Sequence, residues 1–272
     1  MTVAALRGHS GNLVGVPTGL LASAVFNDHP LPLHIRGVHE GHARLFDHLA
    51  TADSHAEAAD HFQDYMNNTF SLRPAITDTS DGTVRRFRAS YLRLLKGWGY
   101  DSNSREGAVM KGWVESRFGL FPTFHETALA RFASSAWSRY VEAKMSSRFH
   151  NNDIFAQLDL LYEFCQWSIG RWFRPGKHHL TLYRGVNDFH EDNLLHGQAR
   201  PRRGNALVRL NNIVSFTARR DIACEFGDTI LEAHVPMVKV LFFNELLPRH
   251  ALKGEAEYLV IGGDYRVTVS YL

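Results

Sequence analysis

The sequence predicts an α+β fold in which a helical N-terminal half is followed by a mainly antiparallel β-sheet. Up to about residue 175, apolar residues recur at helical intervals. After Arg174-Pro175-Gly176 they alternate with polar residues in short runs, which is typical of strands. The chain has 272 residues, enough to bury a sizeable core. We therefore expect residues 1–176 to form a mainly helical region and residues 177–272 a β-rich region, packed as one compact unit.

Within the N-terminal half, frequent Gly and Pro predict an irregular lead-in over residues 1–32, with one short strand at 20–26. Ser54 and Glu57 have the spacing of a capping box, which predicts a helix that runs to about Asn67. The other predicted helices span residues 85–98, a shorter stretch around 113–118 that ends at Gly119, 123–141 behind a second capping box at Thr123-Phe124-His125-Glu126, and 153–172.

The C-terminal part predicts strands separated by polar or glycine breaks, with one helix among them. The predicted strands span residues 180–186, 208–217, 229–235, 238–243, 257–261 and 265–271, and the predicted helix spans 218–226.

Bulk composition excludes several classes of protein. Lys and Arg total 30 and Asp and Glu 28, a formal net charge of +2, so no broad basic surface for nucleic acid is expected. Cys165 and Cys224 form no CxxC motif, and we expect free thiols in a reducing compartment. No basic leader followed by an apolar core and no long apolar run occurs, which predicts a cytoplasmic protein. The 16 histidines lack an HExxH or similar pattern, so we expect them at the surface or core edge, with no metal.

Three strand-like segments carry polar residues that could perform chemistry. Arg184 ends an apolar row and precedes Gly185; it needs an anion, either a ligand or an internal acid. Ser215 and Thr217 share one strand face, although ordinary strand-end hydroxyls would look the same. Glu255 and Glu257 precede an apolar run, and a charged turn is the alternative interpretation there.

The order Arg-Gly, Ser-x-Thr and Glu-x-Glu on successive strand-like segments resembles the arginine-specific mono-ADP-ribosyltransferases, whose signature is Arg-Gly, Ser-x-Ser and Glu-x-Glu. That resemblance covers about residues 180–272. Residues 111–119 and 182–187, together with the helical half, are similar to the bacterial dinitrogenase reductase ADP-ribosyltransferase family over almost the whole length. Thr217 departs from the pattern but keeps the hydroxyl. The resemblance implies that the sheet is an ADP-ribosyltransferase core.

The family resemblance implies a transfer of ADP-ribose from NAD to an arginine of a target protein. It implies that Glu257 stabilises the ribosyl cation and that Ser215 orients the Glu257 carboxylate. It places Arg184 on the phosphates or the adenine-side ribose, and Gly185 on the nicotinamide amide, with Thr217 also at the cofactor. The implied target is the nitrogenase iron protein, which the modification would inactivate, and the implied regulator is a PII signalling protein that binds the helical region.

Further expectations concern the acceptor. A guanidinium is cationic and a poor nucleophile, so Glu255, on the same strand face as Glu257, would grip it and help remove a proton. Phe226 is expected to pack in the core, with stacking on the cofactor as the alternative. Residues 244–253 form a predicted loop with three leucines, including Leu246 and Leu247, that would dock the target.

Two other functions stay open. The chain could be an NAD glycohydrolase or a transferase that acts on another acceptor, such as a small guanidine or a nucleic-acid base. It could also be a catalytically silent nucleotide-binding module. The paired acids Glu255 and Glu257 argue against the silent module because binding NAD requires neither of them, and the near-neutral charge disfavours nucleic acid.

Overall fold

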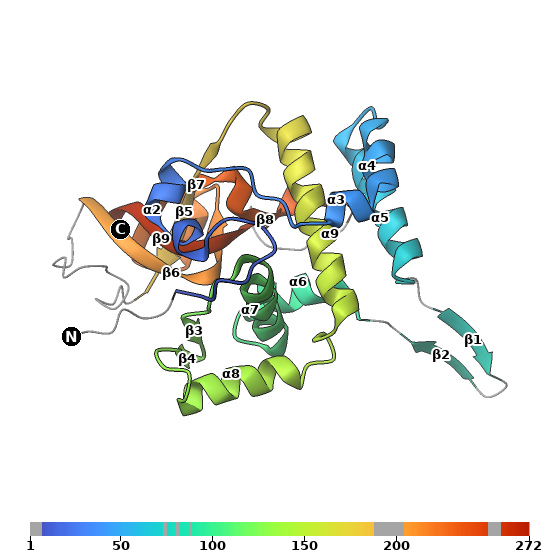
Figure 1. Cartoon of the computed structure of the whole chain (residues 1–272), viewed down its shortest axis with the longest axis horizontal. Coiled ribbons are helices and arrows are strands. Elements are labelled where there is room, and N and C mark those ends of the chain that lie inside the picture. The colour runs from blue at the N-terminus through green and yellow to red at the C-terminus, as the bar shows by residue number, and fades with distance from the viewer. Residues whose placement is uncertain are drawn as a thin grey trace.

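The computed structural model describes residues 7–72, 75–79, 82–86, 89–187, 204–249 and 257–271. Helices precede a five-stranded antiparallel sheet, which confirms the predicted α+β fold (Figure 1). The α-helices are α1 (Thr18–Leu21), α2 (Ala24–Asp28), α3 (Val38–Gly41), α4 (Ala43–Ala50), α5 (His55–Thr69), α6 (Tyr91–Tyr100), α7 (Arg105–Phe118), α8 (Ser135–Met145), α9 (Asn152–Ser168) and α10 (Arg220–Glu225). The strands are β1 (Ala75–Thr79), β2 (Gly82–Arg86), β3 (Phe124–His125), β4 (Thr127–Ala128), β5 (His179–Val186), β6 (Gly204–Thr217), β7 (Thr229–Pro236), β8 (Val240–Phe243) and β9 (Glu257–Tyr271).

The main sheet has the strand order β6-β5-β7-β9-β8, with an additional pairing between β6 and β9. The first part of β9 pairs with β8 and with residues 213–217, and its second part pairs with β7 and with residues 204–210. The long strands β6 and β9 therefore run through the whole sheet. They place the C-terminal end of β6 beside the first residue of β9.

A bulge lies where the β6–β9 pairing changes. Asn211 and Asn212 together oppose Gly262, so the register shifts between Leu210 and Ile213. A Cβ atom on Gly262 would lie 1.6 Å from the carbonyl oxygen of Asn211, so only glycine fits this close approach. The predicted break between two strands at 257–261 and 265–271 is wrong, because the glycines here accommodate a bulge and β9 continues.

Side chains of the bulge hold the middle of α7 and the segment after this helix. Asn212 is buried and its Nδ2 donates to the carbonyl oxygens of Lys111 and Leu120, at 2.8 and 3.0 Å. Asn211 Oδ1 accepts the N–H of Thr123 at 3.0 Å. The second predicted capping box is therefore wrong: Thr123 leads into the β3–β4 hairpin, and α8 begins only after Ser134, whose Oγ accepts the N–H of Trp137.

Other helix boundaries also differ from the prediction. Residues 20–26 are helical rather than a strand, because Ser23 caps α2 by accepting the N–H of Phe26 at 3.2 Å. Arg85 and Arg86 belong to β2, and the following helix α6 begins at Tyr91. The capping serine at the start of α5 is confirmed.

Helix α9 joins the helical half to the sheet. It lies beside β8, between the sheet and α5, and continues into a π-helical turn at Ile169–Phe173 (Figure 1). Tyr162 Oη lies 2.8 Å from the carbonyl oxygen of Val238, and Gln166 Nε2 donates to that of Val240 at 2.8 Å. Apolar residues of helices and sheet form one continuous core. That residues 1–176 and residues 177–272 have separate functions stays a prediction.

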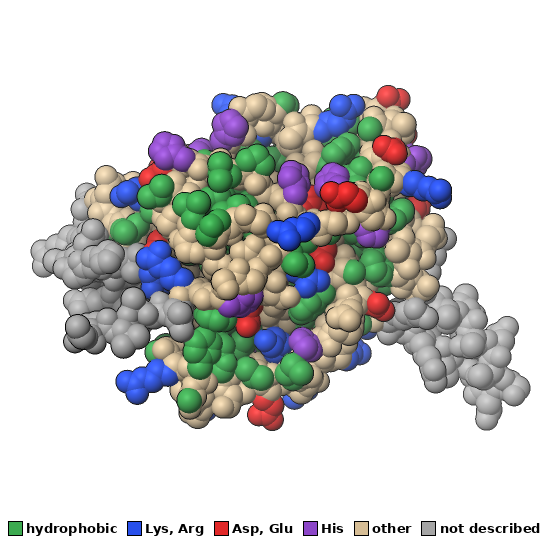
Figure 2. All heavy atoms as spheres, viewed as in Figure 1, with side chains coloured by type: hydrophobic (Ala, Val, Ile, Leu, Met, Phe, Trp, Pro, Cys, Tyr) green, Lys and Arg blue, Asp and Glu red, His purple; other side chains and the backbone are tan. Residues whose placement is uncertain are grey.

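The surface agrees with the near-neutral composition. On the face drawn in Figure 2, Lys and Arg side chains are interspersed with acidic ones instead of forming one basic area. Cys165 and Cys224 are both free, as expected. Among the helices that the structure describes, none is long and apolar enough to cross a membrane.

Lys239 is a fully buried cation in a short 3-10 turn before β8. Its Nζ donates to the carbonyl oxygen of Gly262 at 3.2 Å and lies 5.0 Å from the ring centre of Tyr265. Desolvation lowers the pKa of Lys239 to about 7, although the negative charge of Asp264 raises it.

We expect Lys239→Met to flatten the pH dependence of stability. An unfolded lysine keeps its proton up to about pH 10, so from pH 7 upward the unfolded chain binds more protons and this lysine makes stability rise with pH. Urea unfolding across about pH 7 to 10 measures the slope. The exposed Lys96→Met is the control and should keep the wild-type slope; an unchanged slope in Lys239→Met would contradict the assignment.

Candidate active site

A cavity of about 590 Å³ lies where β5, β6, β9 and α10 meet the end of α6. Each described residue that the sequence analysis selected for the site lines it, namely Arg184, Gly185, Ser215, Thr217, Phe226 and Glu257. Other lining residues include Trp98, Tyr100, Asp101, Ser102, Tyr183 and Asn187. The fold thus brings three motifs that are far apart in the sequence to one place, while the role of each residue stays a prediction.

The pairing of β6 with β9 positions Glu257. Thr217 lies opposite Glu257 and Ser215 opposite Leu259, so the hydroxyls and the carboxylate share one face of the sheet. Ser215 Oγ donates a hydrogen bond of 2.6 Å to Glu257 Oε1. A short bond to a charged acceptor is among the stronger hydrogen bonds in proteins. Ser215 therefore fixes the direction of the Glu257 carboxylate.

Trp98 is a site residue that the sequence analysis missed. Its Nε1 donates to Ser215 Oγ at 3.0 Å, and its side chain is buried. Because the Ser215 hydroxyl accepts from Trp98 and donates to Glu257, both of its roles are occupied. A tryptophan flanked by Gly97 and Gly99 was the only signal in the sequence, and that signal is indistinguishable from an ordinary helix end.

Arg184 joins β5 to β6 at this cavity. A terminal nitrogen of its guanidinium donates to the carbonyl oxygen of Ser215 at 2.7 Å. Burial lowers the pKa of Arg184, and the negative charge of Glu257 raises it. Glu257 is therefore an internal acid for the Arg184 guanidinium, and the same guanidinium lines the cavity.

The close approach of α10 explains why residue 185 is a glycine, Gly185, which the sequence alone did not reveal. A Cβ atom there would lie 1.9 Å from the carbonyl oxygen of Ala223, so the glycine lets α10 approach β5. This packing places Phe226, at the end of α10, on the rim of the cavity with 66% of its surface exposed. The expectation that Phe226 packs in the core is therefore wrong.

Glu255 lies outside the described residues, and its position relative to Glu257 stays a prediction from spacing. The loop at 244–253 is described up to Arg249, so Leu252 lies outside the described residues, and the prediction that Leu246 and Leu247 form a docking surface is wrong. Leu246 and Leu247 are completely buried, because a 3-10 turn at Asn244–Leu246 directs this segment into the core.

A five-stranded antiparallel sheet that presents an arginine, a serine and a serine-held glutamate to one cavity is the arrangement expected of an ADP-ribosyltransferase. Residues 11–269 match the family model described as dinitrogenase reductase ADP-ribosyltransferase (DRAT). The chain is 58% identical over 268 residues to "NAD(+)--dinitrogen-reductase ADP-D-ribosyltransferase" of Rhodospirillum rubrum, covering 97% of this chain and 96% of that protein. No solved structure matches the chain.

The chain therefore belongs to the dinitrogenase reductase ADP-ribosyltransferase family. Membership confirms the predicted class of enzyme, an ADP-ribosyltransferase with NAD as its substrate. It also removes the silent nucleotide-binding module as an interpretation of the cavity.

We expect Trp98→Phe to lower kcat for NAD cleavage about fivefold, because loss of one positioning hydrogen bond costs about 1 kcal/mol. The matched control is Trp113→Phe, which loses a 2.7 Å indole bond to Asp159 away from the cavity. The control should lose stability and keep kcat per folded molecule. Equal kcat values for the two variants would contradict a positioning role of Trp98.

Proposed function

We propose that this protein transfers ADP-ribose from NAD to an arginine side chain of the nitrogenase iron protein, with release of nicotinamide and inactivation of the target. The observation that carries the mechanism is the 2.6 Å hydrogen bond that holds the Glu257 carboxylate at the cavity. The choice of target is supported by the relative from Rhodospirillum rubrum, whose name states that it acts on dinitrogen reductase.

Glu257 acts on the ribose. As the bond between the nicotinamide nitrogen and the ribose carbon breaks, both electrons leave with nicotinamide and the sugar becomes an oxocarbenium ion. A fixed carboxylate beside this cation stabilises the transition state more than the ground state. Ser215 and Trp98 keep the carboxylate oriented, so little reorganisation is needed when the charge develops.

Arg184 and Phe226 hold the rest of NAD in this proposal. The Arg184 guanidinium lines the cavity and has the shape and charge that suit a phosphate. One guanidinium nitrogen is held by its hydrogen bond to the carbonyl oxygen of Ser215. Phe226 offers an exposed ring at the rim on which a planar group can stack. Gly185 and Thr217 line the same cavity beside them.

Glu255 selects the acceptor. Two residues before Glu257 along the strand direction, it would present a second carboxylate on the same face. That carboxylate binds the incoming guanidinium and takes the proton that is released when the new bond between nitrogen and the ribose carbon forms. Without it, water is the remaining acceptor and the product is free ADP-ribose, as in the glycohydrolase alternative.

Regulation by a PII signalling protein and a cytoplasmic location complete the proposal. The regulator rests on the family resemblance, and the location rests on the two free cysteines, which fit a reducing compartment. The helical residues 1–176 are the proposed binding region. Calorimetric titration of the full chain with a purified PII protein tests this, and absence of saturable binding with or without nucleotides would remove PII from the account.

We expect Glu257→Gln to lower all NAD turnover by two to three decades, since a positioned electrostatic group contributes about 3 to 4 kcal/mol to the barrier. Glu255→Gln should lose transfer to the iron protein and keep measurable NAD hydrolysis. Labelled NAD, incubated with and without purified iron protein, measures both products.

Glu232→Gln is the matched control for both substitutions. Glu232 is a partly buried glutamate on β7, in the same sheet but not among the residues of the cavity. The control should transfer and hydrolyse as wild type does. Full activity of Glu257→Gln would overturn the mechanism, whereas full transfer by Glu255→Gln would overturn only the acceptor role.

A further inference from the structure

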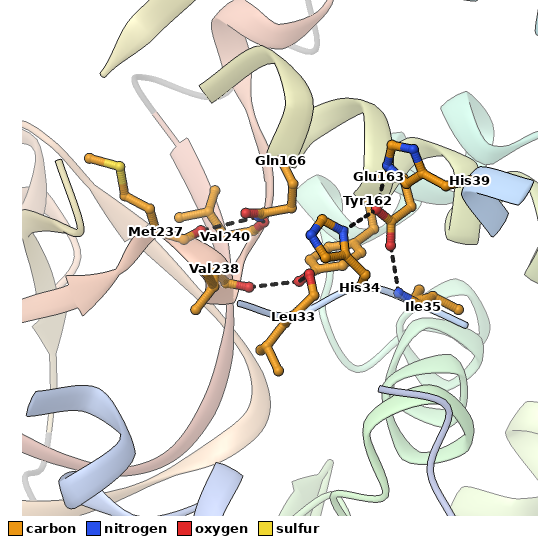
Figure 3. A network of polar contacts seen from close by, with 10 residues as sticks. All are labelled: Leu33, His34, Ile35, His39, Tyr162, Glu163, Gln166, Met237, Val238 and Val240. Carbon is orange, nitrogen blue, oxygen red and sulfur yellow. Dashed lines mark hydrogen bonds and ion pairs between the residues drawn. The ribbon is translucent and has the colours of Figure 1, made fainter. Parts of the chain in front are cut away.

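Three side chains that could bind a metal ion meet away from the active-site cavity. His34, in the segment before α3, and His39, within α3, both point to Glu163 of α9 (Figure 3). His34 Nδ1 lies 2.9 Å and His39 Nε2 3.2 Å from the same oxygen, Glu163 Oε2. No other group of three such ligands occurs among the residues that the structure describes.

The Glu163 carboxylate is completely buried, so its charge requires compensation. Its second oxygen, Oε1, accepts the backbone N–H of Ile35 at 2.5 Å. The two imidazoles are 61% and 41% exposed, and they cover the carboxylate from the solvent side. A protonated imidazole can balance this charge, and a metal ion bound between the rings and Glu163 would balance it with both imidazoles neutral.

We propose that His34, His39 and Glu163 bind a divalent transition-metal ion, with zinc as the best fit. The candidate ligand atoms all lie within 4.8 Å of one another. Zinc is held tetrahedrally by imidazole and carboxylate at about 2.0 to 2.2 Å, which requires ligand atoms about 3.3 to 3.5 Å apart. The two distances to Glu163 Oε2 are already close to that spacing.

Two contacts with neighbouring residues orient these ligands. The His39 ring stacks on Phe46 at 3.8 Å between ring centres, which fixes its plane. The Ile35 N–H fixes the carboxylate. Both histidines line a cavity of about 330 Å³, so a fourth ligand such as water can reach the ion. A metal ion held by three protein ligands, with its fourth position open to solvent, can exchange with ions in solution.

A metal ion at this site would link the segment around α3 to α9, the helix that packs against β8 of the sheet. Tyr162, next to Glu163 in α9, lies 3.2 Å from the carbonyl oxygen of Leu33 and 2.8 Å from that of Val238 (Figure 3). Val238 precedes β8, which pairs with the first part of β9. An ion bound at Glu163 would therefore stabilise the packing of α9 against β8, the strand that pairs with the first part of β9.

Protons compete with the ion. The hydrogen bond to Glu163 raises the pKa of His34, as do the negative charges of Glu163 and Glu40, against the lowering effect of burial. The ion displaces the proton from His34 Nδ1 when it binds, so affinity should increase as pH rises. The stabilisation should follow the same direction.

The test is a titration of the full chain with zinc chloride, followed by calorimetry and by thermal unfolding. Wild type should bind one ion, and Tm should rise by several degrees and return after addition of EDTA. Cobalt(II), used as a spectroscopic substitute, should give visible absorption typical of a tetrahedral site. The double variant His34→Gln, His39→Gln should bind at least tenfold more weakly.

The matched control is His48→Gln, His61→Gln, which removes another pair of close histidines, stacked at 3.9 Å on α4 and α5. It should bind the ion as wild type does. Both pairs are at least partly exposed, so the variants should fold, which the buried Glu163→Gln need not do. Absence of saturable binding in wild type, or equal binding by the His34/His39 variant, would overturn the proposal. Stability that depends on pH but not on metal would identify a proton-held ion pair and overturn it as well.

Discussion

The hydrogen bond from Ser215 to Glu257 is the interaction on which the rest of the site depends. It exists because the bulge at Asn211 and Asn212 sets the register in which the end of β6 meets the start of β9. The same bulge holds α7 and the segment after it through side-chain amides. Trp98, from α6, completes the arrangement from the helical side. The carboxylate is thus oriented by the register of the sheet and, through Trp98, by helix α6.

The helical half is part of the support of this site. Helix α9 bonds through Tyr162 and Gln166 to the chain around β8, and β8 pairs with the first part of β9. The apolar core is continuous across these elements. A change at Glu163, on the same helix, could therefore alter the stability of β9, the strand that carries Glu257, without any contact with NAD. This provides a physical route by which an event in the helical half could affect the sheet.

Much of the fold could be predicted because period-2 alternation and glycine breaks are local properties of the sequence. Strands β5, β6, β7 and β8 follow from the alternation and the cap at Ser54 from the capping-box spacing, whereas the glycine break predicted within β9 is a bulge. The errors arose where tertiary contacts override local pattern: Asn211 takes the N–H of Thr123, so that a capping box becomes a hairpin. Burial of Leu246 and the role of Trp98 depend on partners distant in sequence, which spacing alone does not reveal. The order of Arg184, Ser215 and Glu257 was informative because each lies at the cavity end of a strand.

The central claim is that the serine-held carboxylate faces the nicotinamide ribose of NAD. A crystal structure of the full chain with a non-hydrolysable NAD analogue tests it most directly. The account predicts a ribose hydroxyl within hydrogen-bond distance of Glu257, a phosphate or ribose oxygen at Arg184, and Ser215 still bonded to the carboxylate. An analogue bound elsewhere, or a ribose out of reach of Glu257 in this cavity, would contradict it.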